Sequence, residues 1–548
     1  MTGQRETPSD GRDGPRGAGL LTVLACATLL VAPLVPGALS SGTPSALLGL
    51  PVESLVVLTV LLTVVRPPLR ALAAVLFATA VVVAIVAASL DLGFRATIDR
   101  PFSVAEDGGA LVDAFGVAED ALGRLGATSA LLLVGVLAAT TGAMVGLAAL
   151  RVGRVAAGEE RRGRAIVGAL AAVWIVGALA GAQLVPGAPV AASRTADTLV
   201  ETSSRAVSSV REQEAFERAL ASDPLDDRAP AELMTALAGK DVVVAFVESY
   251  GRVAVDPTPF TAVVARALDD GASTLARRGY SARSAFLSSP TFGGVSWFAH
   301  ATLQTGVWVD SPRKYDRLLS RDRTTLTGIF EAAGWRTMAV VPSNERGWEE
   351  GESFYGFDTV LDARSMGYRG PAFGYARMPD QFTWKVFHDH AVVDDSRPVM
   401  AEIDFVSSHT PWTPLPRMVP WRDLGDGSVF ESHAAEDESA VAAWADPERV
   451  RELYAESVAY SLATMFSYLE TFDQHDLVLI VLGDHQPARI VSGPDADHDV
   501  PITIIAQDSA VLDAIEAWDW EEGVHPSDAA PVWRMDDFRD RFVDAFSR

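Results

Sequence analysis

Residues 289–300 read Ser289-Pro290-Thr291-Phe292-Gly293-Gly294-Val295-Ser296-Trp297-Phe298-Ala299-His300, and no Pro or Gly follows before Gly306. The two glycines permit a close backbone approach, and the uninterrupted run predicts a helix that starts near Ser296 and ends at Gly306. Because a helix N-terminus carries unpaired N–H groups and a partial positive charge, a hydroxyl there favours a phosphate group or an alkoxide. A serine that only caps its helix fits the same stretch.

Composition limits the classes of protein to which this chain can belong. It has 548 residues, too many for one ordinary domain. Its mean hydropathy of +0.18 is high, and the apolar excess lies in the first third, which indicates membrane spans. The formal net charge of −26 disfavours nucleic-acid binding, because phosphate backbones require a basic surface. With one cysteine, Cys26, the sequence has no disulfide framework and no cysteine metal site.

Five apolar stretches in the first third are each close to the ~20 residues that cross a bilayer core. They cover 18–36, 46–65, 71–90, 127–150 and 165–186. Arginines gather before the first stretch, between the second and third, and between the fourth and fifth, at positions 5, 12, 16, 66, 70, 151, 154, 161, 162 and 164. Because basic loops stay on the cytoplasmic side, we predict a multi-pass protein of the cell membrane with its N-terminus inside and its C-terminal domain extracellular.

The sequence divides into a cytoplasmic tail, 1–17, a five-span transmembrane domain, 18–187, a juxtamembrane connector, 188–240, and an extracellular domain, 241–548. In the last part, continuous apolar runs predict buried strands and alternate with helical patterns. The strands cover Val242–Val247, Thr337–Val341, Val399–Val406, Leu477–Leu482 and Val500–Ala506, and the helices cover 257–278, 324–334 and 447–472. This alternation predicts an α/β domain with a mostly parallel sheet covered by helices.

Acids and histidines adjoin these strands. They are Glu248 after the first strand, His409 after the third, Asp484 and His485 after the fourth, and His498 just before the fifth. Because ligands gather at the carboxyl ends of parallel strands, we expect these side chains to meet. Glu248, Asp484 and His485 supply two carboxylates and one imidazole, a set suited to Mn²⁺ or Zn²⁺. The Ser296 oxygen would complete four ligands, so the sequence predicts one divalent metal site.

The ordered set of motifs resembles the membrane-anchored branch of the alkaline phosphatase superfamily, namely lipoteichoic acid synthases and lipid A phosphoethanolamine transferases. The matching pieces are the five spans and the motifs Glu-Ser-Tyr-Gly at 248–251, Gly-Gly-Val-Ser at 293–296, Ser-His-Thr-Pro at 408–411 and Gly-Asp-His at 483–485. The resemblance implies an external sulfatase-like α/β domain that holds one catalytic divalent ion, Mn²⁺ in preference to Zn²⁺. Its implied ligands are Glu248, Ser296, Asp484 and His485.

The resemblance also implies the residues that contact substrate. His409 and His498 would contact the phosphate or a second metal ion, and the segments around Trp348 and from Phe373 to Asp380 would form the substrate wall. The nucleophile in those families is usually a threonine. Here Ser296 is the best match because it follows Gly-Gly directly, and Thr291 is its competitor.

These features predict an enzyme that moves a phospho-alcohol group, such as glycerol phosphate, from a membrane phospholipid to a hydroxyl of a cell-envelope glycan or polymer. The group would be carried as a phospho-serine, with His409 protonating the leaving oxygen or steadying the phosphoryl group. An extracellular phosphodiesterase, phosphatase or sulfatase-like hydrolase is an alternative, as is a membrane protein that kept the fold but only binds. His300, one helical turn beyond Ser296, could reach the site, but we expect a packed helix histidine there.

Overall fold

A computed structural model describes residues 15–108, 110–225, 228–391, 397–433, 440–472 and 476–548. Residues 1–14, most of the predicted cytoplasmic tail, lie outside this part, and with them Arg5 and Arg12. The chain forms two compact units. The first comprises residues 1–95 and 100–211, and the second comprises 96–99 and 212–548.

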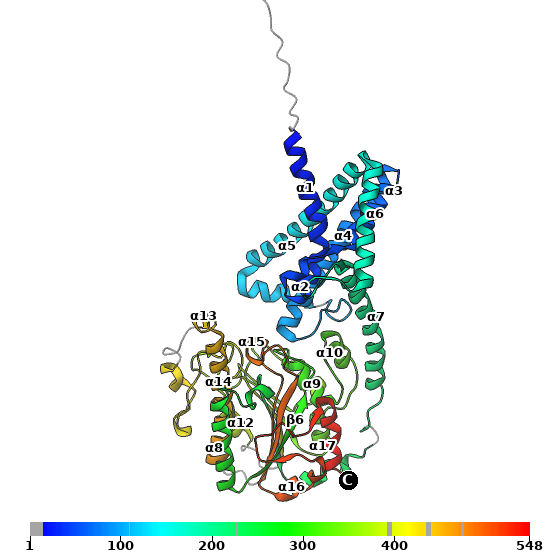
Figure 1. The fold of residues 1–548 in the computed structure, drawn as a ribbon. Coiled ribbons are helices and arrows are strands. Elements are labelled where there is room, and N and C mark those ends of the chain that lie inside the picture. The colour runs from blue at the N-terminus through cyan, green and yellow to red at the C-terminus, as the bar shows by residue number, and fades with distance from the viewer. Residues whose placement is uncertain (1–14, 109, 226–227, 392–396, 434–439, 473–475) are drawn as a thin grey trace, which may run out of the picture. The chain divides into compact units, whose positions relative to one another are not determined.

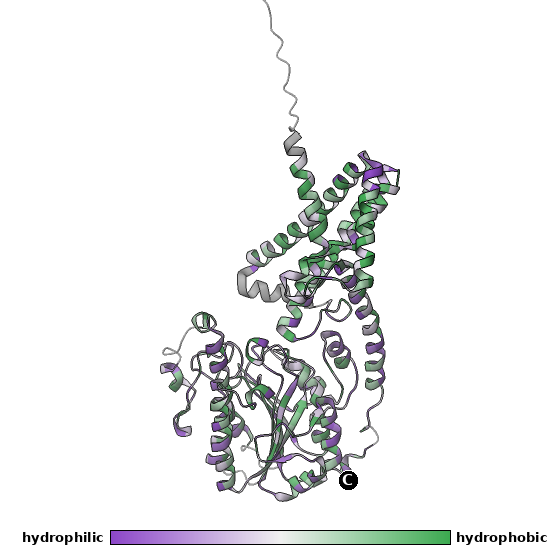
Figure 2. Cartoon of the chain, viewed as in Figure 1, coloured by the Kyte–Doolittle hydropathy of each residue, from purple (hydrophilic) through white to green (hydrophobic). Residues whose placement is uncertain are grey.

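Helices dominate the first unit. They are α1 (Pro15–Val31), α2 (Val35–Ser41), α3 (Val52–Thr63), α4 (Pro67–Ile98), α5 (Ala110–Gly158) and α6 (Glu160–Ala180), with short strands β1 (Leu50–Pro51), β2 (Gln183–Val185), β3 (Ala188–Pro189) and β4 (Ala191–Ala192). Helix α7 (Arg194–Leu220) follows in the predicted connector. Within the described residues, four helical segments are long and apolar enough to cross a membrane, namely Gly19–Ser41, Pro67–Ile98, Arg124–Gly158 and Glu160–Ala180 (Figure 2).

The second predicted span, 46–65, takes a different form. Its helix, α3, has 12 residues, and at 1.5 Å per residue it is about 18 Å long, short of the ~30 Å bilayer core. Residues before it form the strand β1, which pairs with β4. Pro51 stands at the start of α3 and lacks an N–H, so the helix cannot extend through it. The count of five spans therefore stays a prediction.

The second unit is built on a sheet with the strand order β12-β6-β11-β10-β5-β9-β7-β8, and β13 pairs with β6. The strands are β5 (Asp241–Val247), β6 (Ser281–Ser288), β7 (Arg336–Val341), β8 (Thr359–Asp362), β9 (Val399–Phe405), β10 (Leu477–Gly483), β11 (Asp499–Ala506), β12 (Glu521–Glu522) and β13 (Val532–Arg534). All five strands predicted from apolar runs are present.

The sheet is mixed. The expected parallel arrangement is present from β10 to β8, and it is interrupted at β11. Strands β10, β5, β9, β7 and β8 run parallel, whereas β11 is antiparallel to both β10 and β6. A strand buried on both faces is a continuous apolar run in either direction, so the sequence of β11 does not reveal its orientation. Because β11 is reversed, its first residues lie at the sheet edge where β10 ends.

Helices cover both faces of this sheet and seal two cores. Alternate residues of β5 enter different cores: Val243 and Ala245 pack on one side, and Val244 and Phe246 on the other. The first core is closed by α8 (Ala262–Arg278), α12 (Asp380–Ala391) and α14 (Pro447–Thr471), and the second by α9 (Ser296–Thr305), α11 (Leu326–Ala332) and α17 (Phe538–Phe546) (Figure 1). The remaining helices are α10 (Pro312–Leu319), α13 (Ala440–Ala443), α15 (Arg489–Ser492) and α16 (Ser509–Asp513).

Candidate active site

The carboxyl ends of β5 and β10 bring together the predicted metal ligands. Glu248 follows β5, and Asp484 and His485 follow β10, its parallel neighbour. One ligand atom from each of the three lies within 4.8 Å of the others. The Ser296 hydroxyl, at the start of α9, donates to Glu248 Oε2 at 3.1 Å and lies 3.3 Å from His485 Nε2. The structure therefore joins four residues that are far apart in the sequence.

The hydrogen bonds of His485 define which of its nitrogens faces this cluster. Nδ1 lies 2.8 Å from the carbonyl oxygen of Gln486, and since a carbonyl only accepts, Nδ1 carries a hydrogen. Nε2 lies 3.4 Å from Glu248 Oε1 and 3.4 Å from Asp484 Oδ2. A lone pair beside two carboxylate oxygens is unfavourable unless a cation lies between them. A histidine held through Nδ1 by a carbonyl is the usual arrangement of a metal ligand.

Asp484 is held on one side and unpartnered on the other. Its Oδ1 accepts the N–H of Ser249 at 2.7 Å and its own neighbour's N–H, that of His485, at 2.8 Å. Its Oδ2 is buried, and among the described residues it has no hydrogen-bond partner. Burial, followed by the charge of Glu248, raises the pKa of Asp484 to about 6. A buried carboxylate oxygen without a donor costs free energy that a bound cation would recover.

The pKa of Glu248 is shifted in the opposite direction to that of Asp484. Burial alone would raise the pKa of its carboxyl, but the imidazoles of His409 and His485 and a hydrogen bond from Ser249 hold that pKa below its ordinary value. The Ser408 hydroxyl donates to the carbonyl oxygen of Glu248 at 2.6 Å and fixes the backbone at this point. Glu248 is thus ionised at neutral pH, the state that a metal ligand requires.

The loop before α9 sets the position of Ser296. Gly293 and Gly294 have positive φ, and so does Val295, at 66°, a left-handed conformation that is costly for a β-branched residue. The helix starts at Ser296 and ends before Gly306, as the sequence predicts. The competitor Thr291 is buried, donates to the carbonyl of Gly294, and is not among the residues that line the adjoining pocket. This geometry favours Ser296 as the nucleophile.

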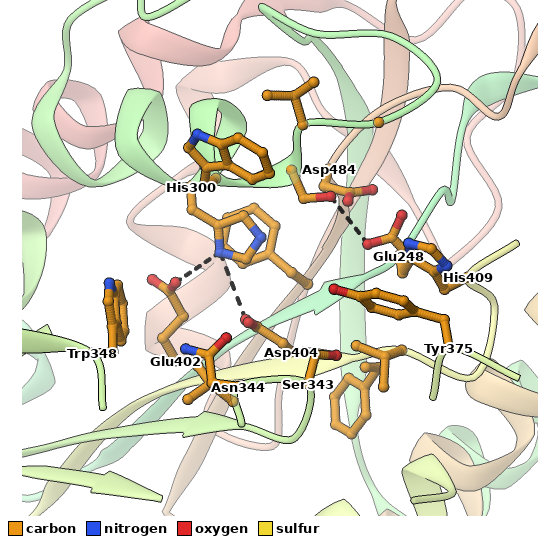
Figure 3. A pocket seen from close by; sticks show the side chains of 18 of the residues that line it. Glu248, His300, Ser343, Asn344, Trp348, Tyr375, Glu402, Asp404, His409 and Asp484 are labelled. Carbon is orange, nitrogen blue, oxygen red and sulfur yellow. Dashed lines mark hydrogen bonds and ion pairs between the residues drawn. The ribbon is translucent and has the colours of Figure 1, made fainter. Parts of the chain in front are cut away.

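A pocket of about 440 Å³ opens beside these ligands (Figure 3). Ser296, Glu248 and Asp484 line one part of it. Aromatic side chains line much of the rest, namely Phe246, Trp297, Tyr315, Trp348, Tyr355, Tyr375 and Phe405. Five carboxylates face it, and among the described residues that line it there is no Lys or Arg. A phosphate group entering this pocket would therefore depend on histidines and a bound metal ion for its positive charge.

A second cluster, His300 with Glu402 and Asp404, lines the same pocket, and the sequence analysis did not identify it. His300 Nδ1 lies 2.9 Å from Glu402 Oε1 and 3.6 Å from Asp404 Oδ1 (Figure 3). The two acids are alternate residues of β9 and so point to one face, while His300 stands one turn after Ser296 on α9. Burial raises the pKa of Asp404 to about 7. Burial alone would lower the pKa of His300, but Asp404 and Glu402 raise it to about 9.

The predicted substrate residues His409 and Trp348 line the pocket. His409 stacks on Tyr375, with ring centroids 3.8 Å apart and planes at 16°, and its Nδ1 lies 2.6 Å from the carbonyl oxygen of Thr410. Tyr375 belongs to the predicted substrate wall and also lines the pocket. These three side chains stand where a substrate could touch them.

Asp380, by contrast, is fully buried and is outside the pocket lining, which corrects its expected contact with substrate. Its Oδ1 accepts the N–H groups of Val406 and Ser407, both at 2.9 Å, and its Oδ2 accepts the Ser461 hydroxyl at 2.6 Å. Its carboxylate holds the segment that leads to His409.

His498 is likewise outside the pocket lining. Its Nδ1 lies 3.3 Å from the carbonyl oxygen of Ser289, and its ring packs at a tilt against Phe292, with centroids 5.2 Å apart. It thus supports the loop before α9. Its position does not support the expected contact with phosphate.

The donor set of the first cluster fits a divalent metal ion. Two carboxylates, one neutral imidazole nitrogen and one hydroxyl oxygen are hard to borderline ligands, as Mn²⁺ and Zn²⁺ prefer. The unpartnered Oδ2 of Asp484 is the observation that points to a cation. The residues that would hold it are those that the sequence predicts: Glu248, Ser296, Asp484 and His485.

Comparison of sequences gives no match, either to a protein-family model or to a curated protein. Comparison of structures gives several. The lipoteichoic acid synthase LtaP from Listeria monocytogenes is 14% identical, with 56% of this chain and 71% of that chain covered and a TM-score of 0.34. The phosphoglycerol transferase GacH of Streptococcus pyogenes, solved with sn-glycerol-1-phosphate, is 11% identical, with 62% and 81% covered and a TM-score of 0.38.

A protein in the alkaline phosphatase superfamily from Vibrio parahaemolyticus is 16% identical, with 54% of this chain and 69% of that chain covered and a TM-score of 0.33. These structures include a lipoteichoic acid synthase and a member of the alkaline phosphatase superfamily, the groups that the sequence motifs resemble. At identities of 11% to 16% and TM-scores of 0.33 to 0.38, the roles of individual residues rest on the geometry of this chain.

Proposed function

We propose that this protein is a metal-dependent phosphotransferase of the cell membrane. It would move a phospho-alcohol group, such as glycerol phosphate, from a membrane phospholipid to a hydroxyl of a cell-envelope glycan or polymer. The group would be carried on Ser296. The observation that supports this most directly is the meeting of the Ser296 hydroxyl with Glu248, Asp484 and His485, where the buried Oδ2 of Asp484 has no donor.

The chain's own residues would carry out most of the first step. Ser296 Oγ attacks the phosphorus atom, and its proton passes along the hydrogen bond to Glu248 Oε2. The N-terminus of α9 adds positive potential at the position where the phosphoryl oxygens would lie. A divalent ion, when bound, lowers the pKa of the serine hydroxyl and polarises the phosphoryl oxygen. His409, which stacks on Tyr375 and lies beside Glu248 (Figure 3), would contact the phosphoryl group.

The apolar helices of the first unit support the membrane part of the proposal. A protein that spans the membrane can meet the head group of a phospholipid donor without extracting the lipid. The distribution of arginines supports an N-terminus inside and a catalytic domain, 241–548, outside. Five spans, the last preceding the connector 188–240, give this orientation.

The full-length protein in detergent micelles allows a direct test. We expect it to release diacylglycerol from phosphatidylglycerol only with a divalent ion, and to restore activity after chelation better with Mn²⁺ than with Zn²⁺. Ser296→Ala should lose at least about 10³-fold in rate, because a nucleophile has no substitute. Thr291→Val, the matched control, should keep the rate. Full activity of Ser296→Ala would refute the proposal.

The acceptor determines whether the enzyme is a transferase or a hydrolase. Both reactions share the first half and differ in whether an alcohol or water attacks the phospho-serine. We expect a glycan acceptor to raise the rate of diacylglycerol release and to appear in the product. A rate and product that are independent of acceptor would identify a hydrolase.

A further inference from the structure

The side chain of His300 is held in a continuous hydrogen-bonded chain that begins in the core. The Thr327 N–H and hydroxyl donate to Gln304 Oε1, at 3.0 and 3.1 Å. Gln304 Nε2 donates to Glu402 Oε2 at 2.5 Å, and Glu402 Oε1 accepts from His300 Nδ1 at 2.9 Å. Thr327, Gln304 and Glu402 are buried, with 5% of the Glu402 side chain exposed. Such a chain fixes both the orientation and the tautomer of His300.

The ring of His300 is also held by stacking on another aromatic ring. It stacks on Phe246, with centroids 3.8 Å apart and planes at 20°. With Nδ1 donating to a carboxylate, the other nitrogen, Nε2, points into the pocket (Figure 3). Among the described residues, Nε2 has no hydrogen-bond partner. The stacking on Phe246 agrees with the packed helix histidine expected from the sequence, but the two carboxylates and the unpartnered Nε2 go beyond that expectation.

The pocket has few other groups that could supply a proton or a positive charge. No Lys or Arg is among its described lining residues, and its other histidine, His409, has a backbone carbonyl beside Nδ1 where His300 has carboxylates. A carboxylate behind an imidazole stabilises the imidazolium, as in the arrangement of base and acid in hydrolytic triads. His300 is therefore better supported as a proton donor than His409.

We propose that His300 is a catalytic acid–base residue of the phosphoryl transfer, supported from behind by Glu402 and Asp404 and acting through Nε2. The inference rests on the proposed function and adds to it a residue that no motif of the sequence identifies. Glu402 and Asp404 are positioning residues, because they act through His300.

The proton balance of the two half-reactions is simple. When Ser296 Oγ forms its bond to phosphorus, the bond from phosphorus to the donor's alcohol oxygen breaks, and its electron pair stays on that oxygen. His300 Nε2 gives its proton to this oxygen, so that a neutral alcohol leaves. In the second half, the acceptor hydroxyl attacks phosphorus and gives its proton to Nε2, and the Ser296 oxygen leaves and recovers its own proton from Glu248.

The test uses three phosphodiesters that differ only in the leaving phenol: phenyl, para-chlorophenyl and para-nitrophenyl esters of methyl phosphate. An acid matters most when the leaving oxygen is most basic, and general acid catalysis contributes about 10²- to 10⁴-fold. In the full-length protein with Mn²⁺, His300→Gln should slow the phenyl ester by about 10²-fold or more and the para-nitrophenyl ester by less than about tenfold. His525→Gln, an exposed histidine outside the pocket, is the matched control and should match wild type on all three.

Each other outcome overturns part of the account in a recognisable way. An equal loss on all three esters, or no loss on any, contradicts the acid role of His300 while Ser296→Ala still tests the proposed function separately. If wild type turns over none of the esters and no phospholipid, the proposed function fails and this inference with it. To guard against misfolding, Glu402→Gln, which keeps His300, should show the same selective loss for the phenyl ester with a smaller magnitude.

A second metal ion is the competing occupant of these three side chains, because one ligand atom from each lies within 4.8 Å of the others. Both oxygens of Glu402 and Nδ1 of His300 are already engaged with protein partners, which favours the proton, whereas Oδ1 of Asp404 has no hydrogen-bond donor among the described residues and is the atom that a metal ion would use. We expect one tightly bound divalent ion per chain in wild type and in His300→Gln. Two ions in wild type and one in His300→Gln would contradict the proposal.

Discussion

Two clusters of one histidine and two acids adjoin the same pocket and differ in how their histidine is held. Each contains one buried carboxylate oxygen without a hydrogen-bond donor among the described residues, Oδ2 of Asp484 in the first and Oδ1 of Asp404 in the second. In the first, Glu248, Asp484 and His485 leave a buried carboxylate oxygen without a donor and direct a lone pair at both acids. In the second, the proton on Nδ1 of His300 already lies between Glu402 and Asp404. The first arrangement fits a cation, and the second supplies its own proton.

The difference comes from the group that faces Nδ1 of each histidine, a backbone carbonyl for His485 and a side-chain carboxylate for His300. A carbonyl behind His485 keeps a hydrogen on Nδ1 and leaves Nε2 facing the two acids, where it could serve as a ligand. A carboxylate behind His300 favours a charged ring whose other nitrogen is an acid. The same three residue types thus provide metal binding in one place and proton transfer in the other.

The largest effect is expected from removing the charge of Asp484. Asp484→Asn should abolish metal binding and lower the transfer rate at least about 10³-fold, because a neutral amide does not supply the negative charge that a carboxylate ligand gives a divalent ion. Without metal, however, the variant should be more stable than wild type at pH 7 by on the order of 2 kcal/mol, because a pKa raised to about 6 by burial reports a buried charge that destabilises the fold.

Thermal melting with and without Mn²⁺ measures both parts of this prediction. Wild type should melt higher when the ion is added, and Asp484→Asn should not respond. The sign follows from the raised pKa: metal-free wild type gains stability as the pH falls from above 6 toward 4, and the variant, which keeps the other buried acids with raised pKa values, gains less. A metal-dependent rise in the variant would show that the ion binds elsewhere.

Asp380 provides a third buried acid for comparison, one whose oxygens all have donors. Asp380→Ala should cost about 3 kcal/mol of stability, because two N–H groups and the Ser461 hydroxyl would lose their acceptor in the interior. Asp389→Ala, an exposed residue of the same helix, is the control and should change stability by less than about 0.5 kcal/mol. Equal effects of the two substitutions in a thermal melt would contradict the conclusion that the Asp380 carboxylate holds the segment before His409.

Much of the fold was predictable from the sequence, because strands buried on both faces are continuous apolar runs. Val242–Val247 and Leu477–Leu482 mark β5 and β10, and the residues that follow them are the candidate metal ligands. The reversal of β11 was not predictable, since Val500–Ala506 is equally apolar in either direction. The length of α3, which has 12 residues, was overestimated, because hydropathy alone ignores Pro51.

The second cluster was missed for a different reason. Glu402 and Asp404 lie inside an apolar run that was interpreted only as a strand, Val399–Val406. The signal was present: two acids at alternate positions of a buried strand must both face something that compensates their charge. Asp380 was assigned to substrate because resemblance gives the segment but not the direction of a side chain.

The pH dependence separates the second cluster from the first. His300 must hold its proton to act as an acid, so the rate with the phenyl ester should fall as the pH rises through about 9. The acids that raise this pKa are Asp404, Glu402 and, farther away, Asp484. In Glu402→Gln one negative charge is gone, the pKa of His300 falls, and the alkaline limb should move to lower pH by about one pH unit. An unchanged alkaline limb would exclude His300 as the group that titrates.

The smallest effect is expected at Thr291. Its hydroxyl donates to the carbonyl of Gly294 and it does not line the pocket. Thr291→Val should therefore keep the transfer rate within about twofold while costing about 1 kcal/mol of stability for the lost hydrogen bond. A loss of activity as large as that of Ser296→Ala would exchange the roles of the two residues.

The most direct test of the central claim is to find the covalent adduct. The full-length protein is incubated with phosphatidylglycerol and Mn²⁺ without acceptor, quenched in acid and analysed by peptide mass spectrometry. The account predicts a glycerol phosphate group on Ser296, formed in wild type and in Thr291→Val, and absent in Asp484→Asn. An adduct on Thr291, or phospholipid turnover with no adduct on any residue from 289 to 300, would contradict it.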